Sequence, residues 1–74
     1  MPTMEAVKID GKKLQDARLA KFLSRDELAK VSGIHRDHIG RLERGYGGES
    51  RPPTVRELAA ALDVDPRELL ADEP

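Results

Sequence analysis

The sequence predicts a small all-α domain, and two features carry that prediction. Apolar residues recur at helical spacing in five short segments, and most of these segments follow a residue that can cap a helix. A cap residue with Glu three positions later and then leucine occurs three times, at residues 24–27, 54–57 and 65–68. A chain of 74 residues holds one domain. We therefore expect five helices around one compact core.

The first three helices are expected between residues 10 and 45. The first begins near residues 10–11 and runs to about residue 21. The second covers about 25–32 and stops at Gly33, which can adopt the left-handed conformation of a C-cap. The third starts after His35 and stops at Gly45.

The last two helices are expected at 55–62 and 66–71. Leu58, Ala59 and Leu62 give the fourth helix one apolar stripe. Thr54 is its expected cap. In the fifth helix, Asp65 is the expected cap and proline occupies the first helical position, where its missing N–H is harmless.

Two segments lack a helical pattern. Residues 1–9 form an N-terminal arm or a short strand, because residues 6–9 alternate in polarity; a lone strand needs a partner. Residues 46–53 contain two glycines and two prolines and are expected to be a loop. The helical domain itself is expected to span 10–72.

The composition excludes several classes of protein. The absence of cysteine rules out disulfides and thiolate metal sites. No apolar run could span a membrane, and the N-terminus lacks a signal-peptide pattern, so a cytoplasmic protein is expected. With one Phe, one Tyr and no Trp, the chain is poorly equipped to stack on single-stranded bases.

The net charge of −1 hides an uneven distribution. Residues 12–44 hold nine Lys/Arg and five Asp/Glu, a balance of +4, whereas residues 54–74 hold two and six, a balance of −4. The first segment could face phosphate while the second is turned away. Ordinary solvated faces explain the same numbers equally well.

Residues 25–44 have the pattern of a helix-turn-helix. Ala29 allows two helix axes to approach, and Gly33 supplies the positive φ of a tight turn. Such a motif places its second helix in the DNA major groove. A helical hairpin that serves only the core has the same periodicity. The apolar side chains expected to fix the angle between the two helices are Leu28, Ile34, Ile39 and Leu42.

Residues 14–70 resemble the phage repressor and Cro family, the XRE-like, lambda-repressor-like helix-turn-helix domains. The resembling segments are LSRDELAKVSGIHRDHIGRLERG and TVRELAAALDVDPRELL. The resemblance implies a compact five-helix domain that binds double-stranded DNA with a recognition helix at about 36–44. It also implies an ion pair between Arg18 and Glu43, which would tie the first helix to the third.

The outer face of the third helix supplies the expected base contacts. Arg36 and Arg41 are the expected base readers, since bidentate Arg–guanine contacts are the commonest specific ones. Asp37 could accept a hydrogen bond from cytosine N4. We favour the other role, in which Asp37 stabilises the N-terminus of the helix and orients Arg41. Gly40 either lets a thymine methyl approach the backbone or is simply tolerated.

Phosphate contacts are expected around this helix and at the N-terminal end of the second. Many family members carry Gln at the position of Arg25, so the added charge here puts a specific base role in doubt. His35 and His38 lack further ligands, so no metal site is expected; His35 is a better helix cap. The expected phosphate contacts are Arg25, His38, Arg44, Tyr46 and Arg51.

The function expected from these residues is transcriptional regulation by a repressor that binds DNA. No constellation for catalysis is present, and neither a cofactor nor a small-molecule ligand is expected. A homodimer on a pseudo-palindrome is expected, with Leu19 and the Val7–Ile9 segment at its surface. The alternative is a protein-interaction module, such as an antitoxin or accessory factor, whose binding would depend less on salt.

Overall fold

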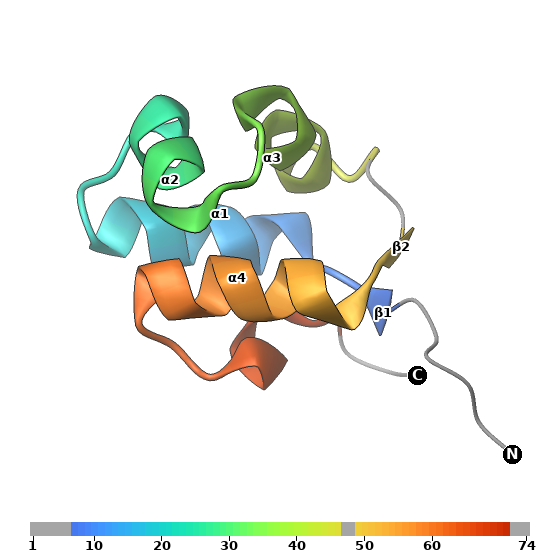
Figure 1. Cartoon of the computed structure of the whole chain (residues 1–74). Coiled ribbons are helices and arrows are strands. Elements are labelled where there is room, and N and C mark those ends of the chain that lie inside the picture. Colours follow the sequence, from blue (N-terminus) through green and yellow to red (C-terminus); the bar gives the residue numbers. More distant parts are fainter. Residues whose placement is uncertain (1–6, 47–48, 72–74) are drawn as a thin grey trace, which may run out of the picture.

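The structure, a computed structural model, describes residues 7–46 and 49–71. Figure 1 shows α2 and α3 on one side of the molecule, α1 and α4 in the middle and the 3-10 helix η1 on the other side. The elements of the described residues are β1 (Val7–Lys8), α1 (Gly11–Ala20), α2 (Arg25–Ser32), α3 (Arg36–Glu43), β2 (Glu49–Ser50), α4 (Pro52–Leu62) and η1 (Pro66–Leu69).

Local capping sets the bounds of the first two helices, as the sequence predicts. Asp10 accepts hydrogen bonds from the backbone N–H groups of Lys12 and Lys13, at 2.9 and 3.2 Å, and so begins α1. Ser24 and Glu27 form the reciprocal capping box that begins α2, with bonds of 3.0 and 2.7 Å. Gly33 ends α2 with φ of 80°.

The last two helices differ from the prediction. α4 begins at Pro52 rather than Val55, because the two prolines fit the first turn, where no N–H is needed. Its N-cap is Arg51, which makes no side-chain capping bond, so Thr54 is not the cap. The expected fifth α-helix is a single 3-10 turn, since Leu70 leaves it in an extended conformation.

Lowering the pH below about 4 is expected to remove stability supplied by Asp65. Its carboxylate caps η1 and accepts hydrogen bonds from the Arg67 side chain and backbone, which hold the pKa of Asp65 below its ordinary value. A depressed pKa stabilises the fold above the unfolded pKa, and this contribution is lost as the pH falls through the folded pKa.

Urea unfolding of the wild type and of the Asp65→Asn variant at low salt, from pH 6 to about 2, checks this expectation. The variant keeps a capping oxygen but cannot titrate, so its stability should fall less steeply on acidification. Equal slopes in the two proteins would contradict it.

The N-terminal segment pairs with two later segments of the chain. The predicted strand at residues 6–9 finds its partner inside the expected loop, with Val7 opposite Ser50. Residue 6 lies outside the described residues. Ile9 forms a bridge with Leu70, and the N–H of Ala71 donates to the Lys8 carbonyl at 2.9 Å.

This pairing directs the apolar side chains of one expected dimer surface toward the core of their own chain. Ile9 is 4% exposed, and Val7 packs against the core, so the Val7–Ile9 segment serves its own chain. Leu19, the other expected dimer residue, is 52% exposed. None of the described helices is long and apolar enough to cross a membrane.

The core lies where the helices meet. Burying a leucine or isoleucine side chain contributes roughly 1.5–3 kcal/mol, so these contacts dominate the stability of a chain this short. Ala29 and Ile34 are partly buried against this core. Its buried apolar residues are Ile9, Leu14, Leu28, Ile39, Leu42, Val55, Leu58, Ala59, Leu62 and Leu69.

The start of α1 touches the end of α3. A Cβ added to Gly11 would collide with the carbonyl oxygens of Leu42 and Glu43. These are backbone atoms, which cannot move away as a flexible side chain can. A glycine is therefore required where α1 meets the last turn of α3, and it was not singled out from the sequence.

Candidate nucleic-acid interface

The turn between α2 and α3 holds the two helices in a fixed arrangement. The buried Ser32 hydroxyl accepts a hydrogen bond from the Ile34 N–H at 3.1 Å. This bond spans the left-handed Gly33, which lies between the two residues. His35 Nδ1 accepts from the Asp37 N–H at 3.1 Å, so His35 caps α3 as expected. The three-residue connection (33–35) is thus held by local hydrogen bonds.

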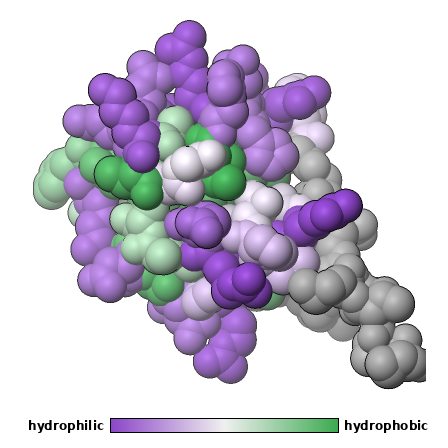
Figure 2. Space-filling view, viewed as in Figure 1, coloured by the Kyte–Doolittle hydropathy of each residue, from purple (hydrophilic) through white to green (hydrophobic). Residues whose placement is uncertain are grey.

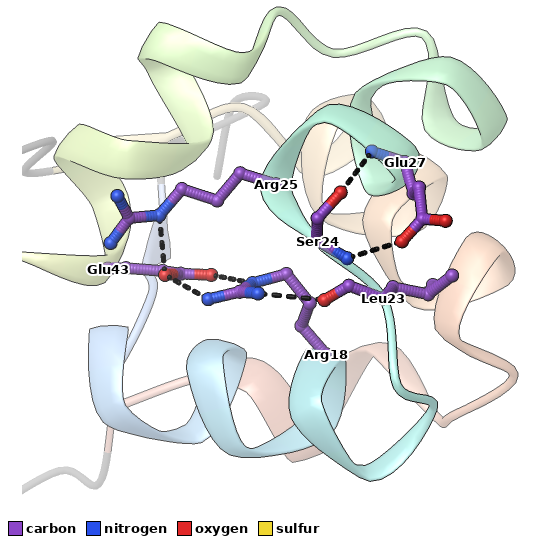
Figure 3. A network of polar contacts seen from close by, with 6 residues as sticks. All are labelled: Arg18, Leu23, Ser24, Arg25, Glu27 and Glu43. Atoms are coloured by element: carbon purple, nitrogen blue, oxygen red, sulfur yellow. Dashed lines mark hydrogen bonds and ion pairs between the residues drawn. The ribbon is translucent and has the colours of Figure 1, made fainter.

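A buried carboxylate ties three helices together (Figure 3). Glu43, at the end of α3, accepts from Arg18 Nε at 2.7 Å and from Arg18 Nη2 at 3.0 Å. It also accepts from Arg25 Nε, at the start of α2, at 3.0 Å. The side chains of Glu43, Arg18 and Arg25 are 1%, 9% and 35% exposed.

The electrostatics of this cluster favour the charged form of Arg18. The hydrogen bonds to Glu43 raise the pKa of Arg18 above its ordinary value, while burial acts in the opposite direction. Arg18 also donates to the Leu23 carbonyl at 2.8 Å. The Arg18–Glu43 pair implied by the family resemblance is present. Its third member, Arg25, was expected only to contact phosphate.

An open groove runs between the N-terminal end of α2 and the outer face of α3. Figure 2 shows hydrophilic side chains gathered along the edge of the molecule where these two helices lie. Six of the residues expected to contact DNA line this groove, whereas His38, Tyr46 and Arg51 do not. The groove is lined by Arg18, Ser24, Arg25, Asp26, Arg36, Asp37, Gly40, Arg41 and Arg44.

Acidic side chains surround the first arginine of α3. Arg36 Nη1 donates to both carboxylate oxygens of Asp26, at 3.1 and 3.4 Å, and its Nε lies 4.0 Å from Asp37. The bond to Asp26 raises the pKa of Arg36. Asp37 therefore faces Arg36 and His35, and the expected contact between Asp37 and Arg41 is absent from the described residues.

Gly40 lines the groove beneath an arginine side chain. It is buried, and the side chain of Arg25 lies over it. A Cβ at this position would meet Arg25 Cδ and Nη1 at 3.9 Å, which is ordinary van der Waals contact. Arg25 is drawn across α3 by its bond to Glu43, a contact that helical periodicity does not reveal.

Replacing Gly40 with alanine is expected to raise the free energy of unfolding by about 0.5–1 kcal/mol. Alanine is the better helix former, and the added methyl group meets no close neighbour. Urea unfolding checks the gain. Duplex affinity should not change, because Arg25 already covers the site. A loss of affinity at unchanged stability would instead support direct approach of DNA to Gly40.

The other two arginines of α3 are differently placed. Arg41 and Arg44 are exposed, and neither has an ion pair or side-chain hydrogen bond within the residues that the structure describes. Both line the groove. Their guanidinium groups are thus available to an anionic partner.

Three expected phosphate contacts lie outside this groove. His38 is partly buried on α3, Tyr46 is 78% exposed after it, and Arg51 is exposed at the start of α4. Residues 47–48, between Tyr46 and Arg51, lie outside the described part of the chain. Across residues 7–46 and 49–71, no three His, Cys, Asp or Glu side chains gather in a way that could hold a metal ion.

Two short helices packed around a left-handed glycine turn, with a basic groove along the second, define a helix-turn-helix domain. The helix-turn-helix family model matches residues 14–69, and the chain belongs to this family.

Several proteins are similar to this chain over most of its length. The chain is 38% identical over 61 residues to the uncharacterized HTH-type transcriptional regulator RghRB of Bacillus subtilis, covering 82% of the chain but 44% of RghRB. The restriction-modification controller protein C.AhdI from Aeromonas hydrophila is 43% identical, with a TM-score of 0.75 over 81% of this chain and 89% of that one. SinR, the biofilm master regulator of Bacillus subtilis, was solved in complex with DNA. That structure is 27% identical, with a TM-score of 0.78 over 81% and 98% of the two chains.

Proposed function

We propose that this chain binds double-stranded DNA sequence-specifically and regulates transcription, as a repressor that occupies its site. The observation that carries the proposal is the groove beside α3, where Arg41 and Arg44 lack acidic partners in the described residues. C.AhdI, a controller protein, and SinR, solved with DNA, support it by fold and sequence.

The geometry supports a division of labour within the groove. α3 enters the major groove, where Arg41 reads a guanine edge. Arg44 contacts the DNA backbone, together with the terminal nitrogens of Arg25. Arg25 is held in place by Glu43, so its guanidinium is oriented before DNA arrives.

A homodimer on two half-sites accompanies this function. Leu19 is the apolar residue we place at its interface, since it is 52% exposed on α1. Sedimentation of the wild type and of Leu19→Lys at DNA-binding concentrations tests the assignment. A wild type that is monomeric both free and on selected DNA would contradict it.

Selection from random duplexes tests the function itself. The expected result is an enriched motif with a two-fold repeat, whose affinity falls steeply as salt rises. Each phosphate contact contributes about 0.9 to the slope of log K against log salt. Absence of binding at low salt would overturn the proposal and favour a protein partner, as in an antitoxin or accessory factor.

A further inference from the structure

The cluster Asp26–Arg36–Asp37 stands apart from the rest of the groove. Arg36 is 62% exposed and sits between two carboxylates that are 60% and 80% exposed. The three side chains together carry one negative charge. Elsewhere in the groove Arg41 and Arg44 carry unopposed positive charge. The groove is therefore polarised, with its acidic end where the first turns of α2 and α3 meet.

This placement opposes the binding of phosphate at the N-terminus of α2. The first turn of a helix attracts phosphate through its N–H groups and dipole. Asp26 is the second residue of α2 and occupies that position with a carboxylate. It also engages Arg36 Nη1 through both of its oxygens. Phosphate that approaches here meets a negative charge and an arginine that is already bound.

We propose that Asp26 is a specificity-determining residue, which restrains Arg36 and so weakens binding to DNA of the wrong sequence. This inference rests on the proposed function. Non-specific binding comes almost entirely from phosphate contacts. At the acidic end of the groove, the Asp26 carboxylate neutralises one arginine and so weakens the contribution of phosphate contacts to binding. Contacts to base edges through Arg41 lie further along α3 and are left in place.

The test compares two charge-matched variants. Asp26→Asn removes the restraint, whereas Asp16→Asn removes an equally exposed carboxylate from the Lys12–Asp16 pair on α1, which does not line the groove. Dissociation constants are measured over a salt series for the selected duplex and for a scrambled duplex. Circular dichroism confirms that each variant is folded.

The expected result is specific to one variant and one duplex. Asp26→Asn should tighten binding to the scrambled duplex several-fold and steepen its salt slope by about 0.9, one additional phosphate contact. Binding to the selected duplex should change less, so the ratio of the two affinities falls. Asp16→Asn should leave both constants nearly unchanged.

A second variant shows whether Arg36 is the intermediary. In Asp26→Asn combined with Arg36→Ala, the extra salt slope should disappear. Asp26→Asn that behaves like Asp16→Asn, or that tightens both duplexes equally, would overturn the inference. A wild type that binds no duplex at low salt would overturn the proposed function instead, so the two failures are distinguishable.

Discussion

Replacing Glu43 with alanine is expected to lower the free energy of unfolding by about 3–5 kcal/mol, because it leaves buried positive charge without a partner. Arg18 carries most of this effect, since its side chain is only 9% exposed. Arg25, at 35% exposed, contributes less because water screens it. Small domains are stable by about 5–15 kcal/mol, so this loss threatens the fold itself.

Urea or thermal unfolding of the variant measures the effect. Asp16→Ala is the matched control, because it removes the acidic partner of Lys12 from an exposed i,i+4 pair. That loss is expected to cost about 0.3–0.5 kcal/mol. If the two variants lost similar stability, the Glu43 cluster would not be what holds α3 to α1 and α2.

Replacing Arg41 with alanine is expected to lower the affinity for the selected duplex by about 1–3 kcal/mol, roughly 5- to 150-fold, and to relax the sequence preference at one position. Arg41 is exposed in the groove, so its removal should leave the stability unchanged. Arg44→Ala should instead weaken binding to all sequences and reduce the salt slope by about 0.9.

The control for Arg41 is Arg56→Ala, an equal change of charge at an exposed position of α4. It should leave the selected motif intact. The measurement is selection and sequencing of bound duplexes for each variant. An unchanged motif with Arg41→Ala, accompanied by equal losses on selected and scrambled duplexes, would reassign Arg41 to the backbone.

The sequence predicts the parts of the fold that local chemistry determines. Asp10, Ser24 and Gly33 each act within a few residues, so the bounds of α1 and α2 follow from the sequence. The fifth segment has a capping box as well, yet it stops after one turn because Leu70 is drawn into a bridge with Ile9. Such non-local pairing leaves no periodic signal in so short a segment.

The site shows the same division between local and non-local information. The arginines of α3 could be placed on one face from helical spacing alone. The direction of each side chain depends on acids from other elements: Asp26 engages Arg36, and Glu43 draws Arg25 over Gly40. These partners lie on different helices, so spacing along the sequence does not indicate them.

The bridge between Ile9 and Leu70 also has a consequence for folding kinetics. Contacts within and between neighbouring helices form early because little chain must be ordered to make them. The pairing of Ile9 with Leu70 closes nearly the whole described chain and is expected to form after the transition state. Ile9→Ala should therefore speed unfolding while hardly changing the folding rate. The bridge between the two ends is thus expected to set how long the native state persists rather than how fast it is reached.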